Sequence, residues 1–595
     1  MKDNKIHTYR TRTNILLTVF LIILFLVLGR FFYLQIIQGN ELKALREQNI
    51  NAFEYIYPKR GRILSRDGVV LAEDRKIFSL AVDIEQKPSE ESIEILSTIF
   101  SDQIQLNDLK DLVSNSLRYR KSEIVIDKIS QQDLAKYLVR GSDLRGFSVI
   151  EGYEREYNNH PSIFHVLGHM GYINNTDINY FSPKIDEYDS RLWRKVGKSG
   201  IERVYEKELQ GQHGKKYFQR NARGDKRVTT DVDPFQEGQE LYTSIDFEAQ
   251  KLAYELMNDR KGSVVVIDLS DFSIPVAIST PSISANDLRD ISSLQYQDLL
   301  NDPSRPLFNR AFMGLYPPAS TIKPLLTVFA LNNGYTDWEE TIFDDGFFRF
   351  EEEERVFNAW REGGHGLTDL RKALVESSNP FFMNLSIRYE KDLFVDFLKS
   401  SSFGSKLCED CYPHQFSPLI NDAWKYKNFG KELFKGDFIN LGVGQGYMLT
   451  TPLHLSLISG ILAKKGNYQL PFMVTKKDNM LNLAENLTDE DWSRLHQSLT
   501  DVIYSPNGTG FRINAGDLKL AGKSGTAQVV DINSREEYDE VRSNELLRDH
   551  AIFIGFAPYD NPKYSIAVIV ENGESGGRVA GPIAKQVLEE LLDDI

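Results

Sequence analysis

A chain of 595 residues is too long to fold around one core, so two to four domains are expected. Its hydrophobic fraction of 41% and charged fraction of 26% are typical of globular protein and argue against a largely disordered chain. The net charge of −15 argues against a nucleic-acid-binding protein, because such proteins usually carry a basic patch.

The first 37 residues have the pattern of a retained membrane anchor. Residues 1–13 form a short basic tail, and an apolar run from Ile15 to Leu28 continues through an aromatic flank to Ile37. A cleaved signal peptide is the alternative, but Arg30 and bulky residues stand where small residues would mark a cleavage site. The sequence predicts a transmembrane signal anchor over 14–37, with the N-terminus inside the cell and the rest exported.

The following stretch carries little recognisable chemistry. Residues from Glu41 to Asn51 suit a helix, and Asp67 with Gly68 marks a tight turn between two strand-like runs. A change of composition between residues 234 and 238 predicts a domain boundary. The exported part therefore divides into residues 38–235 and residues 236–595.

The second exported part has the pattern of an α+β fold. Residues 262–269 with 274–280, and residues 551–556 with 564–571, read as two hairpins. Helical patterns lie between them, including one over residues 247–257, and the chain ends in an amphipathic helix. An antiparallel sheet covered by helices is expected.

Ser320 and Lys323 are the first candidate catalytic pair. If a helix begins at Ser320 after the paired prolines, both side chains lie on one face within reach of each other. A serine hydroxyl is a poor nucleophile until a base takes its proton, and a buried neutral lysine is such a base. Taken alone, however, a Ser-x-x-Lys pattern is usually a helix cap followed by a solvated lysine.

Two further motifs give the pair its significance. Ser377-Ser-Asn379 and Lys523-Ser-Gly525 follow it in the order found in penicillin-binding proteins and serine β-lactamases. From about residue 236 onward the chain resembles the transpeptidase domain of class B penicillin-binding proteins. The resemblance extends back through an extended, β-rich pedestal domain to the membrane anchor.

Within that class the chain most resembles the elongation-type group, penicillin-binding protein 2. The division-type enzymes, which rank second, usually have a threonine where Ser524 stands and lack the run that begins at Gly444. The resemblance to the elongation type rests on Arg60-Gly-Arg-Ile63, His165-Val-Leu-Gly168, Gly363-Gly-His-Gly366 and Gly444-Gln-Gly-Tyr-Met448.

The resemblance implies catalytic roles for four residues. Ser320 would be the acylated nucleophile, and Lys323 would be the base that accepts its proton. Ser377 would help a proton to reach the leaving amine, and Asn379 would bind the substrate amide. The substrate would be a peptidoglycan stem peptide that ends in D-alanyl-D-alanine.

The third motif would bind the end of that substrate. Lys523 and Ser524 would hold its terminal carboxylate, and Gly525 would let the substrate backbone approach closely. The backbone N–H groups of Ser320 and Thr526 would form the oxyanion hole. No cofactor is expected.

Two departures from the family bear on these expectations. The family usually has glycine at the position of Ala319, so alanine is tolerable there if φ is negative and damaging if φ is positive. Some members bind zinc through two aspartates, a histidine and a cysteine. Here His365 and Asp344 remain, while Ala359 and Ser378 occupy the other positions, so no zinc site is expected.

The only cysteines are Cys408 and Cys411. Their spacing is compatible with a local disulfide, a redox pair or half a metal site, and two free thiols remain open. A local disulfide in an oxidising compartment is the favoured interpretation.

The expected function is a membrane-anchored peptidoglycan D,D-transpeptidase that acts in cell elongation and is acylated by β-lactams. The alternatives are hydrolysis, as in a D,D-carboxypeptidase or β-lactamase, a division-type enzyme, and an inactive scaffold or β-lactam sensor. By resemblance, the partners would be lipid-linked precursor strands, a glycosyltransferase of the SEDS family and other proteins of the elongation complex.

Overall fold

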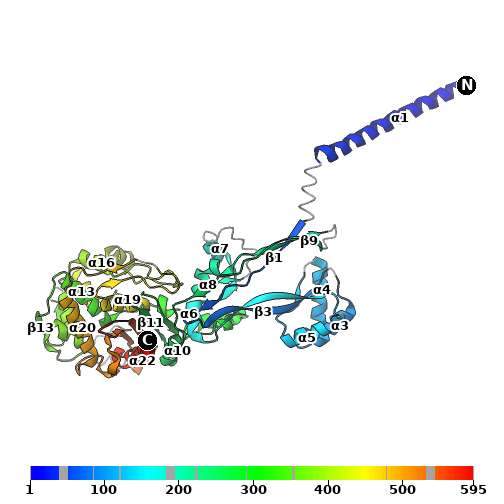
Figure 1. The fold of residues 1–595 in the computed structure, drawn as a ribbon. Coiled ribbons are helices and arrows are strands. Elements are labelled where there is room, and N and C mark those ends of the chain that lie inside the picture. Colours follow the sequence, from blue (N-terminus) through cyan, green and yellow to red (C-terminus); the bar gives the residue numbers. More distant parts are fainter. Residues whose placement is uncertain are drawn as a thin grey trace. The chain divides into compact units, whose positions relative to one another are not determined.

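The computed structural model describes residues 2–38, 51–84, 86–119, 122–141, 143–181, 195–220, 226–289, 291–350, 355–476, 479–530 and 543–593 (Figure 1). Contacts between residues divide the chain into two compact units. Unit 1 comprises residues 1–59, 76–154 and 211–238, and unit 2 comprises residues 60–75, 155–210 and 239–595. Of the helix expected from Glu41 to Asn51, only Asn51 lies within the described residues, where it begins a strand.

Unit 1 begins with a long helix. Helix α1 (Lys2–Phe32) continues into a π-helical turn, η1 (Tyr33–Ile37). The segment Arg12–Ile37 is long and apolar enough to cross a membrane, and its side chains are exposed. This helix fits the single-pass anchor predicted over 14–37.

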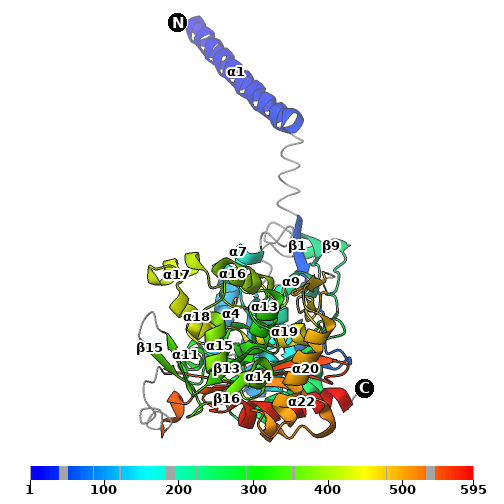
Figure 2. The ribbon, with the colours of Figure 1, turned by 90° about the vertical axis from the view of Figure 1, so that its left-hand side faces the viewer.

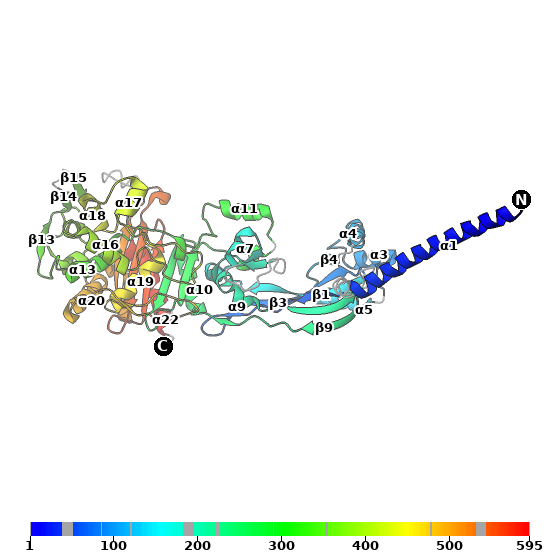
Figure 3. The ribbon, with the colours of Figure 1, turned by 90° about the horizontal axis from the view of Figure 1, so that it is seen from above.

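The remainder of unit 1 contains a sheet and a layer of helices. Strands β1 (Asn51–Ile56), β8 (Gly214–Arg220) and β9 (Lys226–Asp233) form an antiparallel sheet. A separate core contains Leu80, Leu96 and Leu109. It is built from α3 (Glu90–Ile99), α4 (Leu106–Tyr119), α5 (Gln131–Val139), β4 (Ile124–Ile126) and the ends of β3 (Val70–Val82) and β5 (Phe147–Tyr157) that belong to this unit (Figure 3).

The N-terminal segments of unit 2 are short elements. The predicted turn at Gly68, where φ is +82°, joins β2 (Ile63–Leu64) to β3, and β10 (Leu241–Tyr242) pairs with β2 in parallel. The other elements are η2 (Pro161–Ile163), α6 (Phe164–Leu167), β6 (Met170–Tyr172), α7 (Asn175–Phe181), β7 (Lys195–Gly197), α8 (Gly200–Val204) and α9 (Glu206–Gln210).

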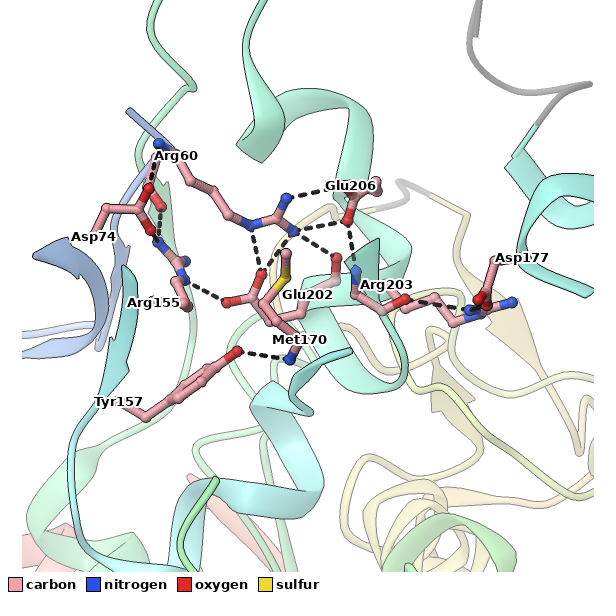
Figure 4. A network of polar contacts seen from close by, with 11 residues as sticks. Arg60, Asp74, Arg155, Tyr157, Met170, Asp177, Glu202, Arg203 and Glu206 are labelled. Atoms are coloured by element: carbon pink, nitrogen blue, oxygen red, sulfur yellow. Dashed lines mark hydrogen bonds and ion pairs between the residues drawn. The ribbon is translucent and has the colours of Figure 1, made fainter. Parts of the chain in front are cut away.

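A buried network of charges holds these segments together (Figure 4). The Arg60 guanidinium donates two hydrogen bonds to the Glu206 carboxylate, at 2.9 and 3.0 Å, and one to Glu202 at 2.8 Å. The Arg155 guanidinium donates to the other oxygen of Glu202 at 2.7 Å and to Asp74 at 3.3 Å. Although burial opposes ionisation of Glu202, Arg155 and Arg60 lower the pKa of its carboxyl group, so Glu202 is ionised.

The centre of unit 2 is a five-stranded antiparallel sheet in the order β12–β11–β21–β20–β19. Its strands are β11 (Gly262–Asp268), β12 (Val276–Thr280), β19 (Ala521–Ala527), β20 (His550–Ala557) and β21 (Tyr564–Val570). Both predicted hairpins are present, but β21 lies between β11 and β20, so the two hairpins form one sheet. The expected α+β arrangement is confirmed.

Helices cover both faces of this sheet (Figure 1). Helix α10 (Phe247–Met257) and the C-terminal helix α22 (Gly581–Asp593) share a core with Val264 and Val266, which point to one face of β11. The alternating residues Val265 and Ile267 belong to the other core, which includes α19 (Pro452–Ala463). Strand alternation thus gives each face its own core.

The rest of unit 2 is helical with small hairpins (Figure 2). Its helices are η3 (Ala285–Leu288), α11 (Ser293–Asn301), α12 (Arg310–Met313), η4 (Ala319–Ile322), α13 (Lys323–Asn332), α14 (Leu370–Val375), α15 (Asn379–Ser386), α16 (Lys391–Ser400), α17 (Asp422–Phe429), α18 (Lys435–Leu441), α20 (Asp489–Tyr504), η6 (Phe511–Ile513), η7 (Gly516–Leu518), η8 (Glu545–Leu547) and η9 (Gly576–Ala580). Its paired strands are β13 (Thr341–Asp344) with β16 (Gly366–Asp369), β14 (Phe347–Phe350) with β15 (Arg355–Asn358), and β17 (Asn467–Tyr468) with β18 (Leu481–Asn482).

Candidate active site

Ser320 lies in a 3₁₀ turn rather than at the start of an α-helix. The turn η4 covers Ala319–Ile322, and helix α13 begins only at Lys323. The reason is Pro324, which has no N–H to donate to the Ser320 carbonyl, so Lys323 makes that bond instead. Because a 3₁₀ turn repeats every three residues, Ser320 and Lys323 still lie on the same face.

The Lys323 amine is fully buried beside the second motif. Its Nζ donates to the side-chain oxygen of Asn379 at 2.8 Å, to the Ser377 carbonyl at 3.1 Å and to the Ser377 hydroxyl at 3.3 Å. Burial, followed by the charge of Lys523, lowers the pKa of Lys323 well below its usual value. Within the described residues Lys323 makes no hydrogen bond to the Ser320 hydroxyl, which is half-buried.

The third motif lies on strand β19 and also reaches Ser377. Lys523 is fully buried, and its Nζ donates to the Ser377 hydroxyl at 3.1 Å and to the Ser524 carbonyl at 3.0 Å. Burial lowers the pKa of Lys523 to about 7. Both lysines therefore share the Ser377 hydroxyl, and a proton has a continuous path between them.

Ser377 takes up this position in a strained conformation. Its φ is +61°, a region that residues with a side chain rarely adopt, and strain of this kind gathers at functional sites. The next residue, Ser378, caps helix α15 through the N–H of Phe381. Asn379 is therefore held in the first turn of α15, beside Lys323.

The remaining residues of the third motif alternate along β19. Ser524 donates to the Thr509 hydroxyl at 2.8 Å, and Thr526, on the same face, is exposed. On the opposite face, a Cβ at Gly525 would lie 2.9 Å from the Thr321 side chain, so this glycine makes room for the turn η4. Among the described strands, β19 is the last of its sheet, so one of its edges pairs with none of them.

Ala319 has a φ of +50°, the unfavourable case foreseen from the sequence. Its N–H donates to the Gly444 carbonyl at 2.8 Å, and a Cβ at Gly444 would lie 2.2 Å from the Ala319 carbonyl oxygen. The packing of these two backbones therefore imposes the left-handed conformation, which explains why glycine is usual at position 319.

Trp360 was not identified from the sequence. Its indole N–H donates to the Ser377 carbonyl at 3.2 Å, and its ring lies 5.7 Å from the His365 ring. The Trp360 side chain is 61% exposed, so its free face borders the space beside the motif. A lone tryptophan in a loop gives no sequence signal for such a contact, because the contact joins segments that are separated along the chain.

The residues at the family's zinc position do not fit a zinc ion. The Asp344 carboxylate accepts hydrogen bonds from the Ser378 hydroxyl at 2.6 Å and from the Gly346 N–H at 2.9 Å, and it lies 2.7 Å from His365 Nδ1. Ala359 offers no ligating atom, so only two strong donors remain where zinc prefers four ligands. The absence of zinc stays a prediction based on this donor set.

Cys408 and Cys411 form a disulfide with an S–S length of 2.03 Å, which confirms the favoured interpretation. Asp410, between them, accepts hydrogen bonds from the Tyr205 hydroxyl at 2.6 Å and from the Met473 N–H at 2.8 Å. The loop closed by this disulfide thus ties the junction of α8 and α9 to a distant part of unit 2.

Comparisons with known proteins identify the family of the chain. The model of the penicillin-binding protein transpeptidase domain matches residues 262–589, and that of the penicillin-binding protein dimerisation domain matches residues 55–243. The peptidoglycan D,D-transpeptidase MrdA of Haemophilus influenzae is 31% identical over 93% of this chain and 86% of its own length. MrdA of Escherichia coli K12 is 31% identical over 95% of this chain and 91% of its own length.

Solved structures give the same result. The chain resembles the penicillin-binding protein PBP2 in the PBP2–MreC complex of Helicobacter pylori, with a TM-score of 0.77, 27% identity and coverage of 92% of this chain and 99% of that one. It also resembles Pseudomonas aeruginosa PBP2 in complex with WCK 5153, with a TM-score of 0.68, 27% identity and coverage of 91% and 97%. The chain therefore belongs to the class B penicillin-binding proteins, in the penicillin-binding protein 2 group.

Proposed function

We propose that the chain is an elongation-type peptidoglycan D,D-transpeptidase in which Ser320 becomes acylated by the stem peptide. The observation that carries the proposal is the shared Ser377 hydroxyl, which receives hydrogen bonds from both Lys323 and Lys523. A nucleophile, a base, a proton relay and a cation are thus available within one site.

The first half of the reaction forms the ester. The Ser320 hydroxyl loses its proton to the neutral amine of Lys323 while its oxygen attacks the carbonyl carbon of the penultimate D-alanine. The backbone N–H groups of Ser320 and Thr526 stabilise the resulting oxyanion. The C–N bond then breaks, and the proton passes through the Ser377 hydroxyl to the departing D-alanine.

Substrate binding supports a positive charge on Lys523. Its pKa of about 7 leaves the amine only partly protonated when the site is empty. A carboxylate close by favours the charged form, so the substrate terminus and Lys523 stabilise each other's charge. The Ser524 hydroxyl and the backbone at Gly525 complete this carboxylate site, and Asn379 binds the substrate amide.

The second half transfers the acyl group. The amine of a neighbouring stem peptide attacks the ester, its proton leaves through the same relay, and Ser320 recovers its hydroxyl proton. Two stem peptides are then joined by a new amide bond. Attack by water would instead give a D,D-carboxypeptidase.

The proposed arrangement in the cell follows from the anchor. We assign residues 1–13 to the cytoplasm, 14–37 to the inner membrane, 38–235 to the pedestal and 236–595 to the extracytoplasmic transpeptidase domain. The basic tail supports this orientation, and the matches at residues 55–243 and 262–589 support the division. Because the H. pylori relative forms a complex with MreC, we include an elongation-complex protein and a SEDS-family glycosyltransferase among the proposed partners.

Labelling with a fluorescent penicillin tests the proposal. The wild-type chain should form a covalent adduct that survives denaturation, and Ser320→Ala should form none. Ser505→Ala, which changes a serine elsewhere in unit 2, should label like the wild type. Labelling that persists in Ser320→Ala would remove Ser320 from its role, and mass analysis of products from stem peptides would separate transfer from hydrolysis.

A further inference from the structure

Helix α17 and the loop after it carry an unusual group of exposed aromatic and basic side chains. Tyr426, Phe429 and Phe434 are 66%, 52% and 49% exposed, and the side chains of Lys427 and Lys431 are exposed beside them. We call these five residues the α17 patch. Helix α17 lies at the periphery of unit 2 (Figure 2).

The α17 patch rests on a rigid aromatic base. The Phe429 ring lies 4.8 Å from the Tyr447 ring, and Trp424 packs against both, at 5.8 and 5.7 Å. Beneath them the buried Lys425 forms an ion pair with Asp437 and lies 4.2 Å from the centre of the Phe434 ring. The exposed Phe429 and Phe434 rings are therefore held in place, which reduces the entropy lost when a ligand binds.

This aromatic base is linked to η4, the turn that contains Ser320. Tyr447 follows Gly444 by three residues, and the Gly444 carbonyl accepts the N–H of Ala319, the residue before Ser320. Helix α18, which leads from the α17 patch to Gly444, also packs against α15, whose first residue is Asn379. The α17 patch is thus connected by short, rigid links to two parts of the site.

The charge of the α17 patch is opposite to that of the whole chain. The chain has a net charge of −15, whereas residues 421–437 contain four lysines against three acids, one of which is Glu432. The other two acids of the segment are engaged, Asp422 with Lys391 and Asp437 with Lys425. A local excess of positive charge attracts an anionic ligand to a protein that otherwise repels it.

We propose that the α17 patch binds the glycan strand of the peptidoglycan substrate outside the reacting peptide. The inference rests on the transpeptidase function proposed above. Flat aromatic rings stack on the C–H faces of sugar rings, and lysines pair with the carboxylates of neighbouring stem peptides along the same strand. The α17 patch therefore holds the strand while one of its stems enters the site.

Equilibrium binding of soluble, uncross-linked peptidoglycan strands with pentapeptide stems tests this proposal. The full chain in detergent micelles is used, in a Ser320→Ala background so that the strands are not consumed. Phe429→Ala combined with Lys431→Glu should weaken binding about tenfold, as expected for an aromatic anchor and a charge at an interface. Tyr296→Ala combined with Lys399→Glu, matched changes outside the α17 patch, should leave binding within about twofold.

Two further probes identify which part of the strand is recognised. Glycan strands stripped of their peptides should bind more weakly to Phe429→Ala than to the chain with Phe429, whereas free pentapeptide should bind all variants equally. Equal binding of intact strands by the patch and control variants would overturn the proposal. An effect seen only with the free pentapeptide would overturn it as well.

Penicillin labelling of the same variants with Ser320 intact separates this proposal from the proposed function. All variants should label at the wild-type rate, because penicillin has no glycan. If the wild type itself fails to label, the proposed function fails; if it labels while patch and control variants bind strands alike, only the α17 patch is refuted. A membrane surface is the other occupant of the α17 patch to be tested, by adding brominated phospholipids and following tryptophan fluorescence. Quenching that disappears in Trp424→Phe would contradict glycan binding.

Discussion

Ala319 is the strained residue of the turn η4. Its φ of +50° costs a residue with a side chain about 1–2 kcal/mol. Replacing it with glycine removes this strain but adds freedom to the unfolded chain, which offsets up to about 1 kcal/mol. Ala319→Gly should therefore stabilise the chain by up to about 1 kcal/mol, measured as a higher midpoint of thermal unfolding.

The matched control is Ala423→Gly, in helix α17, where the backbone is right-handed. Here glycine relieves no strain, and the unfolding midpoint should fall or stay unchanged. A lower midpoint for Ala319→Gly than for the control would show that the turn does not store this strain.

Lys523 gives the site a dependence on pH. Its pKa is lowered to about 7, so the empty site loses the ammonium charge as pH rises through about 7. The kcat/KM for a peptide ending in D-alanyl-D-alanine should fall above that pH, because the carboxylate then meets a neutral amine. A substrate with a terminal carboxamide should lack this alkaline limb. Lys523→Arg should move the limb beyond pH 10, since arginine stays charged.

Lys323, Ser377, Asn379 and Lys523 belong to patterns with fixed internal spacing, so the sequence could single them out, and the structure brings them together. The catalytic role of Ser320 stays a prediction. The contact of the Ser377 hydroxyl with both lysines was not predicted, since it joins residues 54 and 146 positions apart. Trp360 and Thr509 were missed for the same reason. Spacing identifies the chemical groups, and only the fold shows which groups meet.

At the scale of elements, β-rich runs separated by turn residues predicted both hairpins, and helix α10 occupies the residues predicted for it. The insertion of β21 between β11 and β20 was beyond that reasoning, because strand order depends on long-range pairing. The start of α13 was also misplaced, although Pro324 carried the signal. A proline at that position removes the hydrogen bond that would have begun the helix at Ser320.

The contribution of the disulfide loop to the stability of the chain can be measured. Cys408 and Cys411 are three residues apart, so chain entropy predicts that the bond contributes about 2 kcal/mol. The double variant Cys408→Ser, Cys411→Ser should lower the unfolding midpoint by a few degrees. Asp410→Asn keeps the disulfide and tests the carboxylate alone. If the double variant unfolds like the wild type, the hydrogen bonds of Asp410 suffice to hold the loop.

At the scale of the whole molecule, each of the two compact units is built from segments that are not consecutive in the chain. Residues 60–75 and 155–210 belong to unit 2, although they precede the predicted boundary near residue 235. The sequence pattern gave no sign of this, because the contacts that join these segments to residues 239–595, such as the pairing of β2 with β10 and the hydrogen bond from Tyr205 to Asp410, link residues far apart in the chain. The Arg60-Gly-Arg-Ile63 motif becomes intelligible here. Arg60 joins the network, and a Cβ at Gly61 would lie 1.8 Å from the Gln239 carbonyl oxygen.

Arg60→Met tests whether the network holds these segments together. The change leaves the buried Glu206 carboxylate without its guanidinium partner, and breaking a buried pair in this way costs about 3–5 kcal/mol. Adding Glu206→Leu should recover much of the loss, because no unpaired charge then remains on Glu206. Arg62→Met removes an exposed pair with Glu240 and should change the stability far less than Arg60→Met. Urea unfolding of the full chain in micelles, followed by penicillin labelling of the surviving fold, gives the three values. If Arg60→Met and Arg62→Met are equally stable, the buried network does not hold residues 60–75 and 155–210 together.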